Sequence, residues 1–151
     1  MKKVLVLGFV FCLLGACSLH GNLLSRLAML DENARVCFYC GQLQQVENAI
    51  VQKNGDGAII TCAALDAASV YKNVSNCFGF SVRYQNKNVL DDVLSQIRVL
   101  KTEMQDDITI YYGLAQGGVF FDFVGGQKIN IQIAVSNEFV VVGSPIILGG
   151  Y

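Results

Sequence analysis

The chain has 151 residues, of which 53% are hydrophobic and 15% are charged, and its formal net charge is −1. This length fits one domain of ordinary size, and so few basic groups offer no surface of the kind that binds nucleic acid. His20 is the single histidine. A metal site with several histidines is therefore excluded, and a serine–histidine–aspartate triad would depend on His20 alone.

The first sixteen residues have the pattern of an export signal. Lys2-Lys3 precedes an uncharged run, Val4–Ala16, which is too short to cross a bilayer because a spanning helix needs about 20 residues. The end of the run, Leu14-Gly15-Ala16-Cys17, resembles the lipobox of bacterial lipoproteins. That resemblance implies that Cys17 is acylated and becomes the mature N-terminus, and Ser18 after it implies sorting to the outer membrane. The alternative is a plain secreted protein in which Cys17 is a spare thiol.

These features predict the organisation of the chain. We expect a signal peptide over residues 1–16, a lipid-anchored N-terminal segment over 17–30 and one periplasmic domain over 31–151. Acyl chains would hold the protein at a membrane without any basic patch, since more than one buried chain gives stable anchoring.

Four cysteines remain once Cys12 leaves with the signal and Cys17 is acylated: Cys37, Cys40, Cys62 and Cys77. An even number in an oxidising compartment predicts two disulfides. Cys37 and Cys40 could bridge locally, or each could pair with Cys62 or Cys77, and we favour the second arrangement because longer closed loops restrict the unfolded chain more. The wide spacing of the last two cysteines disfavours zinc, so we expect no metal and no cofactor.

The segment Cys37-Phe38-Tyr39-Cys40 resembles the CxxC motif of thioredoxin-type proteins, and the loop around Pro145 looks like the one that places a cis-proline beside that motif. This resemblance implies a membrane-tethered thiol–disulfide oxidoreductase, with Cys37 at a helix N-terminus as the attacking thiol. No clear strand precedes Cys37. We therefore favour structural cysteines and expect no catalytic residues.

The first half of the mature chain has mainly helical periodicity. Apolar residues at spacings of three and four predict a helix that begins near Asp31 and ends near Asn54. The alanine-rich stretch Ala58–Tyr71 predicts a second helix, with a short buried strand at residues 59–62 as the alternative. Phe78–Tyr84 alternates and predicts a strand, and residues 86–88 predict a turn.

The second half begins with a predicted amphipathic helix over Leu90–Met104, with Asp91 and Asp92 in its first turn. Beyond it, short turn sequences separate four predicted antiparallel strands, at residues 108–112, 119–124, 128–135 and 139–142. In the third of these, the isoleucines alternate with Asn130 and Gln132, which predicts a half-buried strand.

Together these elements predict an α+β fold, in which N-terminal helices precede an amphipathic helix packed on a four- or five-stranded antiparallel sheet. The segments VFFDFV and FVVV are apolar on both faces, so the sheet needs cover on two sides or a partner. The segment VRYQNKNVLDDVLSQI, with the strand–helix–strand–strand order around it, resembles small periplasmic modules at the N-termini of secretins and outer-membrane receptors. That likeness implies a docking module inside an envelope assembly.

The expected function is therefore that of an outer-membrane lipoprotein on the periplasmic face, acting as a structural or interaction component of the envelope or of a secretion or assembly apparatus, without enzymatic activity. Its expected partners are the membrane, through the lipid, and an envelope protein or a second copy of the chain, but no nucleic acid. Two alternatives remain, the thiol oxidoreductase and a binding protein that holds an apolar ligand between sheet and helix.

Overall fold

Residues 22–149 are described by the computed structural model, and they form ten strands and three short α-helices. The predicted signal peptide and the predicted lipidation site Cys17 lie outside these residues. The helices are α2 (Leu23–Ala28), α3 (Ala67–Asn73), which follows the 3-10 turn η1 (Ala64–Asp66), and α4 (Val89–Leu94). The strands are β1 (Arg35–Cys40), β2 (Ile50–Asn54), β3 (Gly57–Ala63), β4 (Cys77–Tyr84), β5 (Ile97–Gln105), β6 (Ile108–Ala115), β7 (Asp122–Val124), β8 (Gln127–Ile129), β9 (Ile131–Val135) and β10 (Val140–Ser144).

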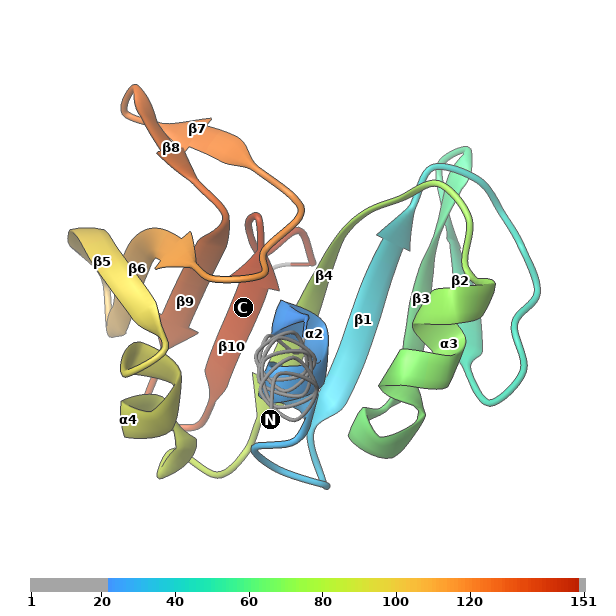
Figure 1. Ribbon diagram of the computed structural model, residues 1–151, viewed down its shortest axis with the longest axis horizontal. Coiled ribbons are helices and arrows are strands. Elements are labelled where there is room, and N and C mark those ends of the chain that lie inside the picture. Colours follow the sequence, from blue (N-terminus) through green and yellow to red (C-terminus); the bar gives the residue numbers. More distant parts are fainter. Residues whose placement is uncertain (1–21, 150–151) are drawn as a thin grey trace, which may run out of the picture.

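Eight strands form one antiparallel sheet in the order β2-β3-β1-β4-β10-β9-β6-β5. Strands from the first half of the chain occupy one side of the sheet and strands from the second half the other, and the two groups meet where β4 pairs with β10 (Figure 1). The remaining strands, β7 and β8, form a separate hairpin that projects from one end of the sheet (Figure 1).

This architecture corrects the predicted fold class. The protein is mostly β, with an eight-stranded sheet in place of four or five strands and with short helices in place of one long amphipathic helix. The expected α+β layers are therefore wrong.

The helix predicted from Asp31 to Asn54 is the first source of the error. Those residues form β1, a loop over residues 41–49 and β2. The sequence of β1 alternates, since Val36, Phe38 and Cys40 are buried while Arg35 is exposed. This period of two competes with the three- and four-residue spacing of the same apolar residues, and pairing with β3 and β4 on both sides decides in favour of the strand.

The helix predicted over Leu90–Met104 is correct only for its first part. Asp91 and Asp92 lie in the first turn of α4, as predicted, but the helix ends at Leu94 and β5 begins at Ile97. A two-residue loop joins β5 to β6, with Gln105 opposite Ile108, and Asp106 has φ 52°. Such loops favour Asp, Asn or Gly in the left-handed region. The hairpin therefore outweighs the helical spacing.

The other predicted elements agree with the structure to different degrees. The predicted strand Phe78–Tyr84 is confirmed by β4, and residues 58–71 divide between β3, η1 and α3, so that both alternatives hold in part. The last four predicted strands correspond to β6 and to parts of β7 to β10. Residues 128–135 are interrupted between β8 and β9 and are almost entirely buried, so the half-buried strand is wrong.

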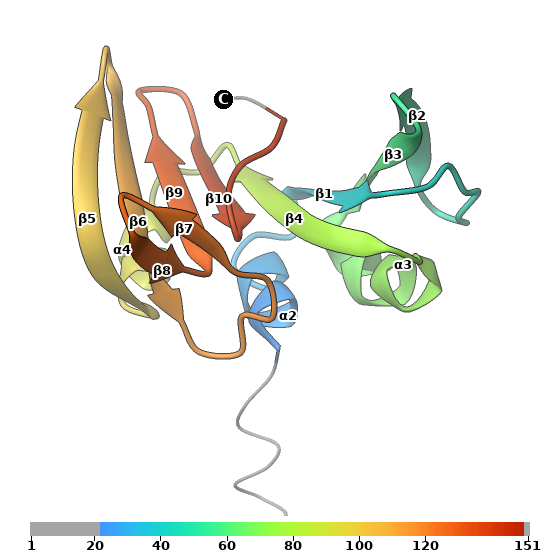
Figure 2. The same cartoon turned by 90° about the horizontal axis from the view of Figure 1, so that it is seen from above.

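The main core lies between one face of the sheet and the three helices, which all lie on that face (Figure 2). Leu23, Leu24 and Leu27 of α2 are almost fully buried against strand residues such as Val82 and Val142. Helix α2, from the predicted anchor segment, is therefore part of the folded domain's core. Apolar burial of this kind contributes most of the stability of a small domain.

The segment after β10 folds back across the second face of the sheet. A Cβ atom added to Gly143 would lie 2.6 Å from the backbone of Ile146, and one added to Gly149 would lie 2.9 Å from the Tyr39 hydroxyl. The amide nitrogen of Ile147 also donates a 2.8 Å hydrogen bond to Gln132 Oε1. Val141, in FVVV, is only 3% exposed, so this part of FVVV is buried without a partner chain.

Candidate functional site

The four cysteines of the described residues lie on or at the ends of three neighbouring strands, and all four are thiols. Cys37 and Cys40 are three residues apart on β1, and successive side chains of a strand point to opposite faces. Cys40 belongs to the main core, whereas the thiol of Cys37 lies 3.4 Å from Thr61 Oγ1. The two thiols of the CxxC motif therefore cannot bridge to each other within this strand.

Cys40 and Cys77 are brought together by the sheet. They are direct partners in the pairing of β1 with β4, and each thiol affects the pKa of the other. Cys37 and Cys62 are not direct partners in the pairing of β1 with β3. Cys37 lies opposite Thr61, and Cys62 lies opposite Val36. The predicted pair of disulfides stays a prediction, and only one of its pairings is supported by adjacent cysteines.

Burial makes the thiols of Cys40, Cys62 and Cys77 poor nucleophiles. Desolvation raises the pKa of Cys40 from 9.0 to about 11, and burial with a smaller effect of the Asp66 carboxylate raises the pKa of Cys62 to the same value. A thioredoxin-type nucleophile needs a lowered pKa and a position at a helix N-terminus. Cys37, the expected nucleophile, lies within strand β1 and not at a helix N-terminus, so the geometry does not favour the oxidoreductase.

Surface depressions within residues 22–149 bear on the predicted apolar ligand site. A depression of about 70 Å³ remains between α2 and residues Tyr71 and Phe80. A larger one, of about 530 Å³, lies at an end of β1 and β3 and is lined partly by Glu32, Arg35 and Asp66. Neither fits the predicted apolar ligand site between sheet and helix, since the first is too small for a drug-sized ligand and the second is lined by no residue of an α-helix.

An exposed apolar ridge on the segment before and within β7 is the clearest candidate for a functional surface. Val119, Phe121 and Phe123 are 64%, 47% and 67% exposed. Phe120, between the first two, instead packs edge-on against Phe80, with 6.3 Å between the ring centres. The ridge is defined here as these three exposed residues. Large apolar groups that gather on a surface mark contact sites more often than isolated ones do.

The hairpin that carries the ridge is fixed to the sheet. Val124 and Ile129 pack with Ile110 and Tyr112 of β6 in a second, smaller core, and the Lys128 ammonium lies 4.2 Å from the centre of the Phe121 ring. The turn between the strands is Gly125-Gly126, with φ of 56° and 79°, a left-handed conformation that glycine adopts at little cost. The ridge is thus presented on a supported hairpin.

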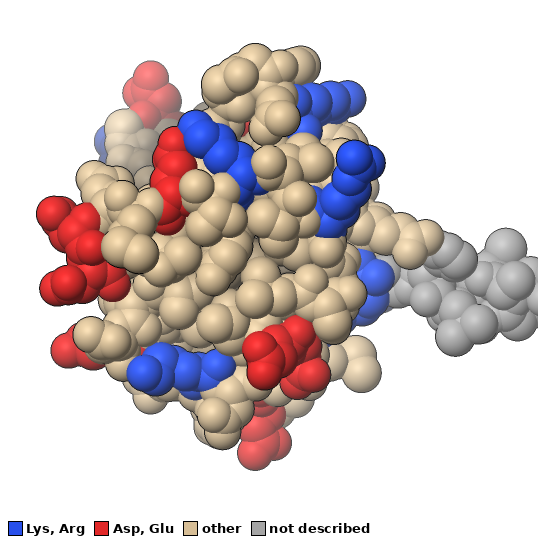
Figure 3. Space-filling view, turned by 90° about the vertical axis from the view of Figure 1, so that its left-hand side faces the viewer, with Lys and Arg blue, Asp and Glu red and all other residues tan. Residues whose placement is uncertain are grey.

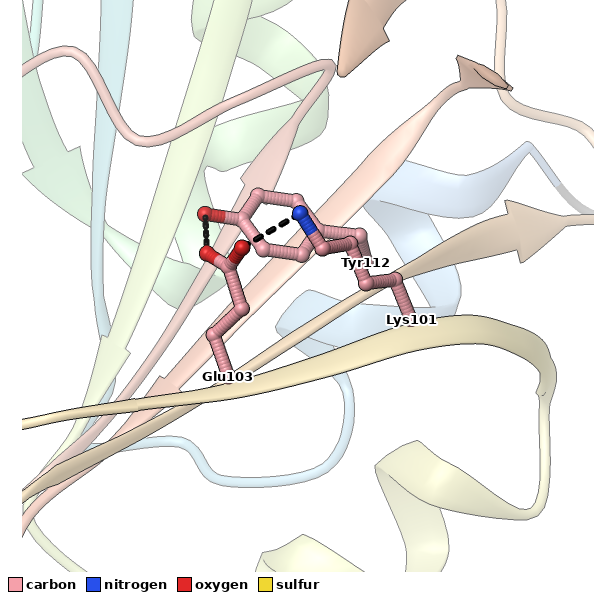
Figure 4. Close-up of polar contacts among 3 residues, drawn as sticks. All are labelled: Lys101, Glu103 and Tyr112. Atoms are coloured by element: carbon pink, nitrogen blue, oxygen red, sulfur yellow. Dashed lines mark hydrogen bonds and ion pairs between the residues drawn. The ribbon is translucent and has the colours of Figure 1, made fainter. Parts of the chain in front are cut away.

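Beside the hairpin, Lys101 forms an ion pair with Glu103, and the Tyr112 hydroxyl donates a 3.2 Å hydrogen bond to Glu103 Oε2 (Figure 4). The hydrogen bond between Lys101 and Glu103 lowers the pKa of Glu103 and raises the pKa of Lys101. Both side chains are exposed, so this contact is a surface feature with a small effect on stability. Figure 3 shows the side of the molecule that lies at the left of Figure 1. The projection at its top consists of uncharged residues, and basic residues lie next to it.

No family model, curated protein or solved structure matches this chain.

Neither a metal site nor a membrane span emerges from residues 22–149. No three metal-ligating side chains gather there, and within the same range no helix has the length and apolar character to cross a bilayer. The ridge was foreseen only in part from the sequence, since VFFDFV was expected to be apolar on both faces. In an extended segment, successive side chains point in opposite directions. The alternation of VFFDFV could therefore have indicated that Phe120 faces inward while Phe121 faces outward.

Proposed function

We propose that this protein is an outer-membrane lipoprotein of the bacterial envelope that binds another protein through the ridge formed by Val119, Phe121 and Phe123. It acts as a structural or interaction component, not as an enzyme. The partner is an envelope protein or a second copy of the chain. The exposure of this aromatic ridge on a supported hairpin is the observation that carries the proposal.

The anchor is supported by the sequence Leu14-Gly15-Ala16-Cys17 and by the charged and apolar residues before it. α2 begins at Leu23 and is packed into the core through that residue. Fully extended, the chain from Cys17 to Leu23 spans at most about 21 Å. An acylated Cys17 would thus keep the folded domain close to the membrane surface.

The ridge suits a protein partner because one of its aromatic side chains, Phe121, is already held by a neighbouring group. Phe121 is held under Lys128 and the neighbouring Phe120 is anchored on Phe80, so binding would order few additional side chains. Aromatic side chains held in this way are typical centres of protein–protein contacts.

The test is site-specific photocrosslinking in cells that express the full chain. A photoreactive residue in place of Phe123 is expected to give a discrete protein adduct, and Phe121→Ser should reduce its yield by removing the neighbouring ring. A photoreactive residue in place of Leu43, which is 52% exposed on the loop after β1, is the matched control and should give no such adduct.

The mass of the adduct distinguishes a second copy of the chain from another envelope protein. Absence of any adduct at position 123, or the same adduct from position 43, would overturn the proposed contact surface.

A further inference from the structure

We propose that Cys40 and Cys77 form a disulfide across β1 and β4, while Cys37 and Cys62 remain thiols. The proposal rests on the proposed function only for the oxidising compartment in which the bond would form. The pairing itself rests on the geometry of the sheet.

A bulge brings the two cysteines to the same position. Tyr39 lies opposite Gly79 and Cys40 opposite Cys77, so Phe78 has no counterpart on β1. Without this extra residue, Cys40 would lie opposite Phe78. Bulges change which side chains of a strand face a given side of the sheet, and this one places Cys77 against the core that contains Cys40.

The backbone at this pair has the spacing that a disulfide requires. On the far side of the pair, the Gly41 amide donates a 3.0 Å hydrogen bond to Asn76 O. The position next to such a bond in an antiparallel ladder is a non-hydrogen-bonded pair, with Cα atoms about 4.5 Å apart. Disulfides join Cα atoms about 4.4–6.8 Å apart, so closure needs no large movement of the strands.

The side chains are also suitably placed. Cys40 lies in the main core and Cys77 packs against it, while Cys77 Sγ donates a 3.3 Å hydrogen bond to Gly79 O. Cys37 and Cys62 face opposite sides of the sheet because their cross-strand partners, Thr61 and Val36, are successive register positions.

The bond forms by exchange with a disulfide oxidant, either a protein disulfide or oxidised glutathione. One of the two thiols, as thiolate, attacks a sulfur of the oxidant and releases one thiol, and the other then attacks the resulting mixed disulfide and releases the second. Two protons and two electrons leave the cysteine pair, and the oxidant is reduced to two thiols.

The experiment is disulfide mapping of the purified full chain after incubation with oxidised glutathione. Free thiols are blocked in denaturant and the chain is then digested with chymotrypsin, which separates Cys37 from Cys40 by cleavage after Phe38 or Tyr39. The expected result is one linked peptide pair that contains Cys40 and Cys77, with Cys37 and Cys62 blocked as free thiols. A linkage that involves Cys37 or Cys62, or blocked Cys40 and Cys77, would overturn the proposal.

Two variants make the assignment specific. Cys77→Ser should abolish the linked peptide and leave Cys40 free, whereas Cys37→Ser, the matched control, should leave the linkage unchanged. Loss of the linkage in Cys37→Ser would also count against the assignment. Because the oxidant is added to the purified chain, these outcomes do not depend on lipidation or on a partner, so failure of the proposed function would be seen separately.

Discussion

The Tyr84 hydroxyl joins the centre of the sheet to α2, since it is buried and donates a 2.7 Å hydrogen bond to the carbonyl of Leu27. Burial raises the pKa of this phenol, with a smaller effect of the Asp31 carboxylate. The contact links a strand from the middle of the chain to the helix nearest the predicted anchor.

Tyr84→Phe should lower the free energy of unfolding by about 1 kcal/mol, the net contribution of one buried hydrogen bond. The effect stays small because Leu27 O also accepts from the Leu30 amide at 3.2 Å. Urea denaturation measures it, with Tyr111→Phe at a less buried tyrosine as the control. An unchanged urea midpoint would show that this hydroxyl does not hold α2.

Cys62 makes stability depend on alkaline pH. Its pKa is raised in the folded protein to about 11 from 9.0, so above pH 9 the unfolded chain releases a proton that the folded chain retains. The free energy of unfolding should therefore be constant below about pH 9 with respect to this group and fall as the pH rises towards 11.

Urea midpoints of the wild type between pH 8 and pH 11 would show this fall, and Cys62→Ala should make it less steep. Thr102→Ala, at an exposed residue of β5 without a titratable side chain, is the control and should keep the wild-type slope. An equal slope in wild type and Cys62→Ala would contradict the assignment.

At the scale of elements, the sequence predicts strands correctly where alternation and turn residues agree, as in β4 and in the pairs joined by Gly125-Gly126 or Ser136-Asn137. It fails where one apolar set fits two periods. Ile97, Leu100 and Met104 suit a helix by spacing, but they lie in strand β5. Ile97 and Met104 pair with β6, and Leu100 is the extra residue where the register shifts. Long-range pairing decides such segments, and spacing within a segment cannot reveal it.

The candidate site shows the same limit. Local sequence predicted an apolar surface at VFFDFV, but Phe120 turns inward on Phe80, a contact between segments far apart in the chain. Likewise, the adjacency of Cys40 and Cys77 depends on a bulge. The spacing of the cysteines in the sequence does not predict that bulge.

The segment after β10 offers an element-scale test. Gly143→Ala would place a methyl group 2.6 Å from the Ile146 backbone and should lower the free energy of unfolding by about 1–3 kcal/mol, as overpacking does. Gly41→Ala is the matched control, because its added Cβ would meet the nearest atom at 3.8 Å. Similar stability of both variants would indicate that the segment lies loosely on the second face.

At the scale of the whole molecule, the helices close one face of the sheet and the C-terminal segment crosses the other (Figure 2). The valines of FVVV are buried within one chain, whereas the side chains of the ridge on the hairpin are exposed. This contrast is why we assign the partner contact to the hairpin and not to the sheet. The proposed lipid at Cys17 would bring that surface to the envelope.

The central claim is that the chain is anchored by acylation of Cys17, and metabolic labelling with a clickable fatty acid tests it most directly. Cells that express the wild type should yield a labelled protein of mature size. Cys17→Ala should carry no label and should accumulate as the unprocessed precursor. An unlabelled wild type, or equal labelling of Cys17→Ala, would contradict the account.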